Sequence, residues 1–202
     1  MTSAIPPDDG LPALKEWGAA IAALLAGRQT VLLRKGGIGE KRFTLGRSRF
    51  LLYPTVAHSH AESTRADHHD LLAVGARDVR LAPDGAPAAV TVRAVAEVTA
   101  AIAVARPDDV AALEPFHVWT TDSVRRNRID FRPRHQLTAI VLSVRPITTP
   151  IELPVLPEYG GCRSWVDLRT GWDTLGGVPV GDPVVEPSAL QRIADDVRSA
   201  VG

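Results

Sequence analysis

Leu14-Lys15-Glu16-Trp17, followed by Gly27-Arg28-Gln29-Thr30-Val31-Leu32-Leu33-Arg34-Lys35-Gly36-Gly37, is the stretch that decides how we expect the fold to begin. Between these two segments apolar residues recur at three- and four-residue steps, which predicts an amphipathic helix over 14–25 that ends at Gly27. Residues 29–34 then predict a strand. That strand ends in two adjacent cations and two glycines, a combination that suits an anionic or strongly polar ligand.

The composition is that of an ordinary globular protein. The chain has 202 residues, of which 45% are hydrophobic and 23% charged. Lys plus Arg and Asp plus Glu both number 23, which argues against a non-specific coat of nucleic acid but not against a local basic patch. The single cysteine, Cys162, provides neither a disulfide framework nor a thiolate zinc site.

The sequence also bears on location. No apolar run approaches about 18 residues, and the N-terminus lacks the basic and then apolar pattern of a signal peptide. We therefore expect a cytoplasmic protein that does not associate with a membrane.

The chain divides into three predicted parts: a flexible tail (1–10), a single α+β domain (11–169), and a Gly/Pro-rich linker with a C-terminal amphipathic helix (170–202). Further strands are expected at 50–53, 90–104, 137–144 and 165–168, and short helices from Pro107 and from Thr121 or Asp122. Pro54 is expected to stop its strand, and 55–72 and 146–160 read as loops. Because strands and helices do not alternate regularly, we expect a small curved mixed sheet with flanking helices.

The first candidate site is the basic turn after the first strand. Arg34, Lys35, Gly36 and Gly37 form a candidate cradle for phosphate or a nucleobase, and a solvated turn is the alternative. Tyr53 and His58 follow the second strand. We interpret His58 as a hydrogen-bond donor or general base near this turn, with a purely structural histidine as the alternative.

Clusters of histidine and arginine form two further candidates. The weak metal-site candidates are His58, His60, His68 and His69, with a polar surface loop as the alternative. Three arginines, Arg125, Arg126 and Arg128, follow the aromatic residue Trp119 in the chain. This combination suits single-stranded nucleic acid or an extruded base. A solvated basic face is the alternative there.

The chain as a whole resembles an uncharacterised bacterial family, domain of unknown function 1802. Five segments carry this resemblance: Ala13–Trp17, Leu32–Ile38, Phe50–Thr55 with His58, His117–Trp119 and Tyr159–Trp165. The family's association with restriction–modification genes implies a nucleic-acid setting.

The order of elements is also similar to the PUA-like barrels, and in particular to the ASCH group, which implies a PUA-like pseudo-barrel. That group carries Gly-x-Lys-x-x-Glu-x-Arg on a strand, and Gly27 and Arg34 match it. Gln29 stands at the lysine position and Leu32 at the glutamate position. Because the group's hydrolase chemistry uses that lysine and glutamate, the resemblance implies binding rather than hydrolysis.

These observations predict a non-catalytic module without a cofactor that recognises DNA or RNA, including a modified or extruded base. Arg34 and Lys35 would hold a phosphate or base edge, Trp119 would offer a stacking face, and the three arginines that follow it would track the backbone. Two alternatives remain: a hydrolase or nuclease-related enzyme using His58, and an assembly subunit that docks a defence-system protein through the C-terminal helix.

Overall fold

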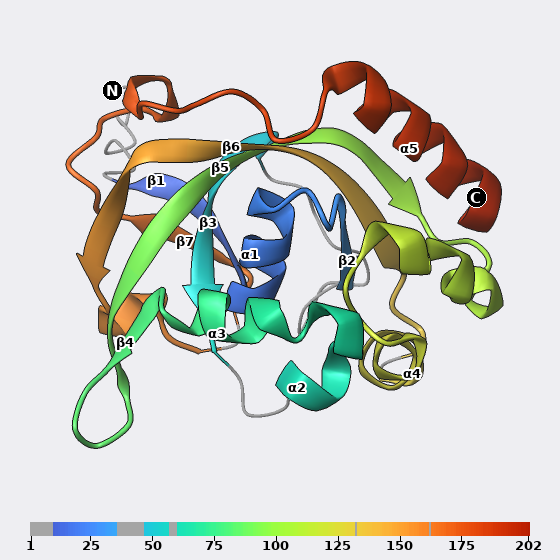
Figure 1. The fold of residues 1–202 in the computed structure, drawn as a ribbon, viewed down its shortest axis with the longest axis horizontal. Coiled ribbons are helices and arrows are strands. Elements are labelled where there is room, and N and C mark those ends of the chain that lie inside the picture. The colour runs from blue at the N-terminus through green and yellow to red at the C-terminus, as the bar shows by residue number, and fades with distance from the viewer. Residues whose placement is uncertain (1–9, 36–46, 57–59, 132, 162) are drawn as a thin grey trace, which may run out of the picture.

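A mixed, open sheet organises the computed structural model, which describes residues 10–35, 47–56, 60–131, 133–161 and 163–202 (Figure 1). The strand order is β2 (Val31–Lys35), β6 (Leu137–Pro154), β5 (Pro87–Ala103), β3 (Arg49–Thr55), β1 (Leu11–Trp17) and β7 (Trp165–Leu168), with β4 (Val79–Leu81) paired to β5. Strands β1 and β3 are parallel, and the other neighbours are antiparallel. The predicted α+β class with a mixed sheet is confirmed, and the sheet does not close into a barrel. The predicted tail at 1–10 lies outside the described residues except for Gly10.

Helices cover both faces of this sheet (Figure 1). They are α1 (Gly18–Leu25), α2 (His60–Ser63), α3 (Asp70–Ala76), α4 (Thr121–Val124) and α5 (Pro187–Val201). The 3₁₀ segments are η1 (Ala66–His68), η2 (Pro107–Phe116), η4 (Pro157–Tyr159) and η5 (Leu175–Gly177), and η3 (Arg125–Asp130) is a π-helix. Helix α1 lies under the arch formed by β5 and β6, and α5 lies over it.

The arch follows from irregular pairing between the two longest strands. The register of β5 and β6 shifts between Val92 and Ala94 and again between Val98 and Ala100. An extra residue at such a point bends a strand and increases its twist. The strand predicted over 90–104 is confirmed with slightly different bounds, and it forms the long, bent strand β5.

The first half of β6 is buried on both faces. Leu137, Ala139 and Val141 pack in one core cluster with α5, whereas Ile140 and Leu142 pack in another with α1. A strand covered on both faces has no polar side, so its apolar residues form a nearly continuous run instead of alternating with polar ones. The strand predicted over 137–144 is confirmed as the first part of β6, which lies inside the sheet between β2 and β5.

The predicted helix over 14–25 is wrong in its first part. Residues Leu11–Trp17 form β1, and the helix begins only at Gly18. The spacing of Leu14, Trp17 and Ile21 fits a helix, but β1 pairs with β3 on one side and β7 on the other. Two strand partners outweigh a local helical preference.

The two segments predicted as loops, 55–72 and 146–160, also contain regular structure. Residues 55–72 include α2, η1 and the start of α3, whose exposed polar residues hid the helical pattern. Strand β6 continues to Pro154. The N–H of Val155 donates a hydrogen bond to the carbonyl of Ala88 in β5, so the neighbouring Pro154, which has no N–H, leaves no donor missing from that ladder. Strand β3 likewise continues through Pro54 to Thr55.

Candidate functional site

The end of β2 brings Arg34 to a buried carboxylate. Glu16, at the end of β1, is 6% exposed, and its Oε2 lies 3.5 Å from Arg34 Nη1. Its Oε1 accepts a hydrogen bond from the N–H of Trp17 at 2.9 Å, and Arg34 Nη2 donates to the carbonyl of Lys15 at 2.6 Å. A buried carboxylate requires a cation and hydrogen bonds to compensate for lost water. Arg34 therefore stabilises the junction between β1 and α1.

Lys35 holds the end of the π-helix η3. Its Nζ donates to the carbonyls of Arg128, Ile129 and Phe131, the last two at 3.0 and 2.7 Å. Carbonyl groups at a helix C-terminus carry partial negative charge and favour a cation. Burial, and then the neighbouring positive charge of Arg128, lower the pKa of Lys35.

Arg128 completes a group of three cations. Its Nε donates to the carbonyl of Leu33 at 3.2 Å, which fixes its guanidinium beside β2. Burial lowers the pKa of Arg128; the charge of Glu16 opposes that effect and the charge of Arg34 adds to it. For Lys35 and Arg128 alike, burial is the main cause of the lowered pKa and a neighbouring cation adds to it, so an anion beside them would stabilise their charged forms.

A groove of about 250 Å³ lies beside Lys35 and Arg128. We call it the basic groove, and its lining residues are Lys35, Val104, Ala105, Pro107, Arg128, Ile129, Pro133, Arg134, His135, Gln136 and Leu137. Arg134 is exposed, and it forms no hydrogen bond or ion pair with any other residue that the structure describes. The groove thus offers a guanidinium that faces solvent, next to two cations held in place by the backbone.

Arg128 also lines a second, much smaller cavity. Trp17, Leu33, Trp119, Ser123, Val124 and Asn127 line it with Arg128, and its volume is about 20 Å³. The ring centroids of Trp17 and Trp119 are 4.8 Å apart at an interplanar angle of 84°. A space of this size holds one water molecule but not a base. Trp119 is 9% exposed and forms a wall of this cavity, rather than an open stacking face.

Of the other predicted ligand-binding residues, only Tyr53 is described, and it lines neither the basic groove nor the small cavity. Tyr53 is 4% exposed and packs against Tyr159 in a separate core cluster, at a ring-centroid distance of 5.9 Å. Burial raises the pKa of Tyr53, and Tyr159 raises it further. Gly36, Gly37 and His58 lie outside the described residues.

The two other predicted backbone-binding arginines lie on η3. Arg125 is half-buried, and it donates to the carbonyl of Asp108 at 3.1 Å. Arg126 is exposed. Of the three predicted arginines, only Arg128 lines the basic groove.

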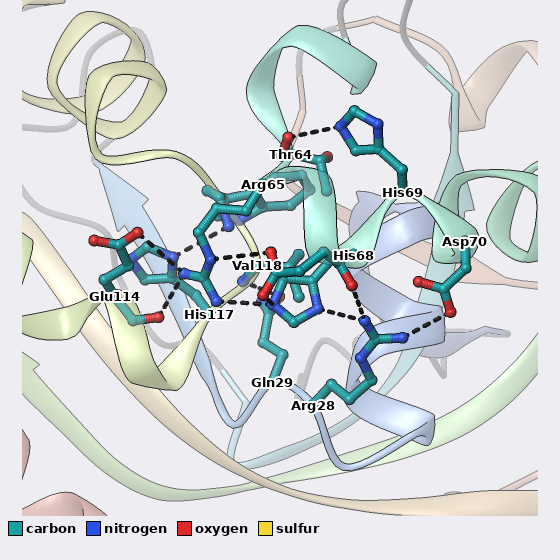
Figure 2. Close-up of polar contacts among 12 residues, drawn as sticks. Arg28, Gln29, Thr64, Arg65, His68, His69, Asp70, Glu114, His117 and Val118 are labelled. Atoms are coloured by element: carbon teal, nitrogen blue, oxygen red, sulfur yellow. Dashed lines mark hydrogen bonds and ion pairs between the residues drawn. The ribbon is translucent and has the colours of Figure 1, made fainter.

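Two histidines of the candidate metal loop, His68 and His69, take part in a polar network (Figure 2), whereas the side chains of His58 and His60 lie outside the described part of the structure. His68 lies between two guanidinium groups: Arg28 Nη2 is 2.7 Å from its Nδ1, and Arg65 Nη2 is 2.8 Å from its Nε2. Burial is the main cause of the lowered pKa of His68. His69 Nε2 lies 3.0 Å from the carbonyl of Thr64. Among the described residues, no group of three or more His, Cys, Asp or Glu side chains could hold a metal ion.

Sequence reasoning did not anticipate the role of His117 in this region. It is 1% exposed, and its Nδ1 accepts a hydrogen bond from the N–H of Trp119 at 3.2 Å. Burial, and then the charge of Arg65, lower its pKa to about 4. Gln29 holds the same segment, because its Oε1 accepts from the N–H of Val118 at 3.3 Å. Both residues are polar in a mostly apolar context, which is the pattern that could have identified them.

Glu16 and Phe131 are further residues that the sequence did not single out. Glu16 stands inside an apolar segment, where an acidic residue requires a partner. Phe131 is an aromatic residue within an arginine-rich stretch, and it is 56% exposed beside the basic groove.

Comparisons with known proteins identify a family and similar structures. The family model described as domain of unknown function (DUF1802) matches residues 13–196. A crystal structure of ASCH from Zymomonas mobilis aligns with a TM-score of 0.45 and 15% identity, over 80% of this chain and 89% of that one. A point mutant of the same protein aligns with a TM-score of 0.45 and 16% identity, over 81% of this chain and 91% of that one. No curated protein matches significantly. None of the helices in the described part of the chain is long and apolar enough to span a bilayer.

Proposed function

The chain belongs to the DUF1802 family, and we propose that it is a nucleic-acid-binding module that holds phosphate groups of DNA or RNA in the basic groove. One observation carries this proposal: Lys35, Arg128, Arg134 and His135 line the same hollow. Phosphate groups bind where several donors and positive charges converge.

The cations of the groove differ in what they contribute. Arg134 faces solvent and offers a planar guanidinium that can bind a phosphate through two parallel hydrogen bonds. Lys35 directs its ammonium group to three carbonyls, so it supplies charge and fixes the wall of the groove. The lowered pKa values of Lys35 and Arg128 favour an anion beside them, because an added negative charge stabilises both cations.

We further propose that the protein recognises a modified or extruded base. The cavity between Trp17 and Trp119 has a volume of about 20 Å³. A base could enter only if one of these rings moved, so base recognition there requires a conformational change. A restriction–modification or defence setting, with a defence-system protein as a partner, is likewise proposed from the family resemblance alone.

Fluorescence anisotropy with labelled oligonucleotides tests the proposal. The informative variant is Arg134→Ala, and the matched control is Arg80→Ala, which removes an equal charge from β4 at the other end of the molecule (Figure 1). We expect Arg134→Ala to weaken binding several-fold for every sequence tested and Arg80→Ala to leave it unchanged. Absence of binding to DNA and RNA, or equal losses in the two variants, would refute the proposal.

A further inference from the structure

An exposed aromatic residue, Phe131, stands in the chain between residues that line the basic groove. The carbonyl of Phe131 accepts a hydrogen bond from Lys35 Nζ at 2.7 Å, and Lys35 lines the groove. Ile129 and Pro133, on either side of Phe131 in the chain, line it as well. The side chain of Phe131 is nevertheless 56% exposed.

The backbone that carries this ring is held firmly. Lys35 Nζ also donates to the carbonyls of Arg128 and Ile129, so one ammonium group ties together the last turn of η3 and the residue that follows it. A ring on a fixed backbone loses little conformational freedom when a ligand stacks on it. Phe131 is therefore pre-organised for an aromatic partner in a way that a ring on an untethered loop is not.

Position and chemistry together define the ligand. Single exposed apolar residues are common on protein surfaces and need no explanation by themselves. Here the ring accompanies cations that can follow a phosphate backbone, and this is the combination by which proteins bind single strands. In a duplex the faces of the bases are covered by their neighbours, whereas a single strand exposes them.

We propose that the basic groove binds single-stranded nucleic acid, with phosphates beside Arg128 and Arg134 and a base stacked on the ring of Phe131. This inference rests on the proposed function and adds to it the strandedness of the ligand and the residue that selects it. Stacking on a ring tolerates any base, so this contact supplies preference for a single strand and not for a sequence.

Three probes separate stacking from charge: a labelled single strand of about 12 nucleotides, its duplex, and an abasic strand of the same length. The protein is used as the wild-type chain and as Phe131→Ala and Phe131→Trp. We expect Phe131→Ala to bind the single strand roughly 5- to 150-fold more weakly and Phe131→Trp to retain binding. The wild type should bind the abasic strand no better than Phe131→Ala does, and neither substitution should change binding to the duplex.

The outcomes distinguish base stacking on Phe131 from phosphate binding in the basic groove. Equal binding of the single strand by the wild type and Phe131→Ala would overturn the stacking role, and the groove proposal would stand if Arg134→Ala still weakened binding. Absence of binding by the wild type would overturn both. Because Phe131 is exposed, Phe131→Ala should fold, and an unchanged circular-dichroism spectrum checks this. If it does not fold, the wild type's comparison of the intact with the abasic strand decides the matter.

Discussion

Glu16 and Arg34 meet where β1 gives way to α1, and their exposed side-chain fractions are 6% and 13%. Such a pair adds little to stability compared with an apolar pair, but loss of one partner leaves the other charge buried and uncompensated. Arg34, which the sequence suggested as a ligand-binding cation, is therefore paired with Glu16 of the same chain. Its partner could not be read from the sequence, because Glu16 and Arg34 meet only when β1 and β2 are in place.

Substitution of Arg34 should reveal this dependence. We expect Arg34→Met to lower the free energy of unfolding by about 3–5 kcal/mol, because Glu16 would remain buried without its cation. The double variant Glu16→Gln/Arg34→Met should recover part of that loss. Urea denaturation of the two variants measures the difference. A cost for Arg34→Met no larger than that of the exposed Arg80→Ala would show that the pair does not hold this junction.

His117 should make stability depend on pH. Its pKa is about 4 in the folded chain, against an ordinary value of 6.5 for a solvated histidine in the unfolded chain. The neutral form is present in both states above pH 6.5, so its contribution is complete there and is lost as pH falls from 6.5 towards 4. Relative to pH 8, the unfolding free energy should fall by about 2 kcal/mol at pH 5 from this residue alone.

Urea denaturation at the two pH values tests this expectation. His117→Gln removes the titrating group, so its stability should change less between pH 8 and pH 5 than that of the wild type. His68, whose pKa is also lowered, contributes in the same direction and remains in the variant. Equal pH dependence in the two proteins would contradict the assignment to His117.

At the scale of elements, helices α1 and α3 cross at two glycines. A Cβ atom added at Gly75 would overlap the backbone of Gly18 and Ala19.

Strands β5, β6 and β7 and helix α5 could be predicted from hydrophobic patterns in the sequence, because each buries a continuous or periodic apolar face. Strand β1 and the end of β6 could not, because their structure depends on partners distant in the chain.

The helix crossing predicts a sharp response to a single methyl group. We expect Gly75→Ala to destabilise the chain by about 2 kcal/mol or more, because backbone atoms must separate to admit the new side chain. Gly176→Ala is the control, since its Cβ atom would meet nothing closer than 3.7 Å. Thermal unfolding compares the two. Similar melting temperatures would mean that the helices separate at little cost.

At the scale of the whole molecule, a neutral chain carries a concentrated patch of positive charge. Lys plus Arg and Asp plus Glu both number 23, yet Lys35, Arg128, Arg134 and His135 line one groove. The sequence indicated a nucleic-acid ligand through Arg34, Lys35 and the arginines after Trp119. It could not indicate the groove, because that surface forms only when the end of β2 meets η3 and the start of β6. Nor could it show that Arg34 and Lys35 are engaged by the protein itself.

The salt dependence of binding tests most directly whether the basic groove holds phosphate groups. The affinity of the wild type, Arg134→Ala and Arg80→Ala for a labelled single strand is measured over a series of salt concentrations. Each phosphate contact contributes a slope of about −0.7 to the plot of log affinity against log salt concentration for a single strand. We predict a slope for Arg134→Ala that is shallower than that of the wild type by about one such contact, and an unchanged slope for Arg80→Ala. The same slope in all three proteins, or affinity that does not depend on salt, would contradict the account.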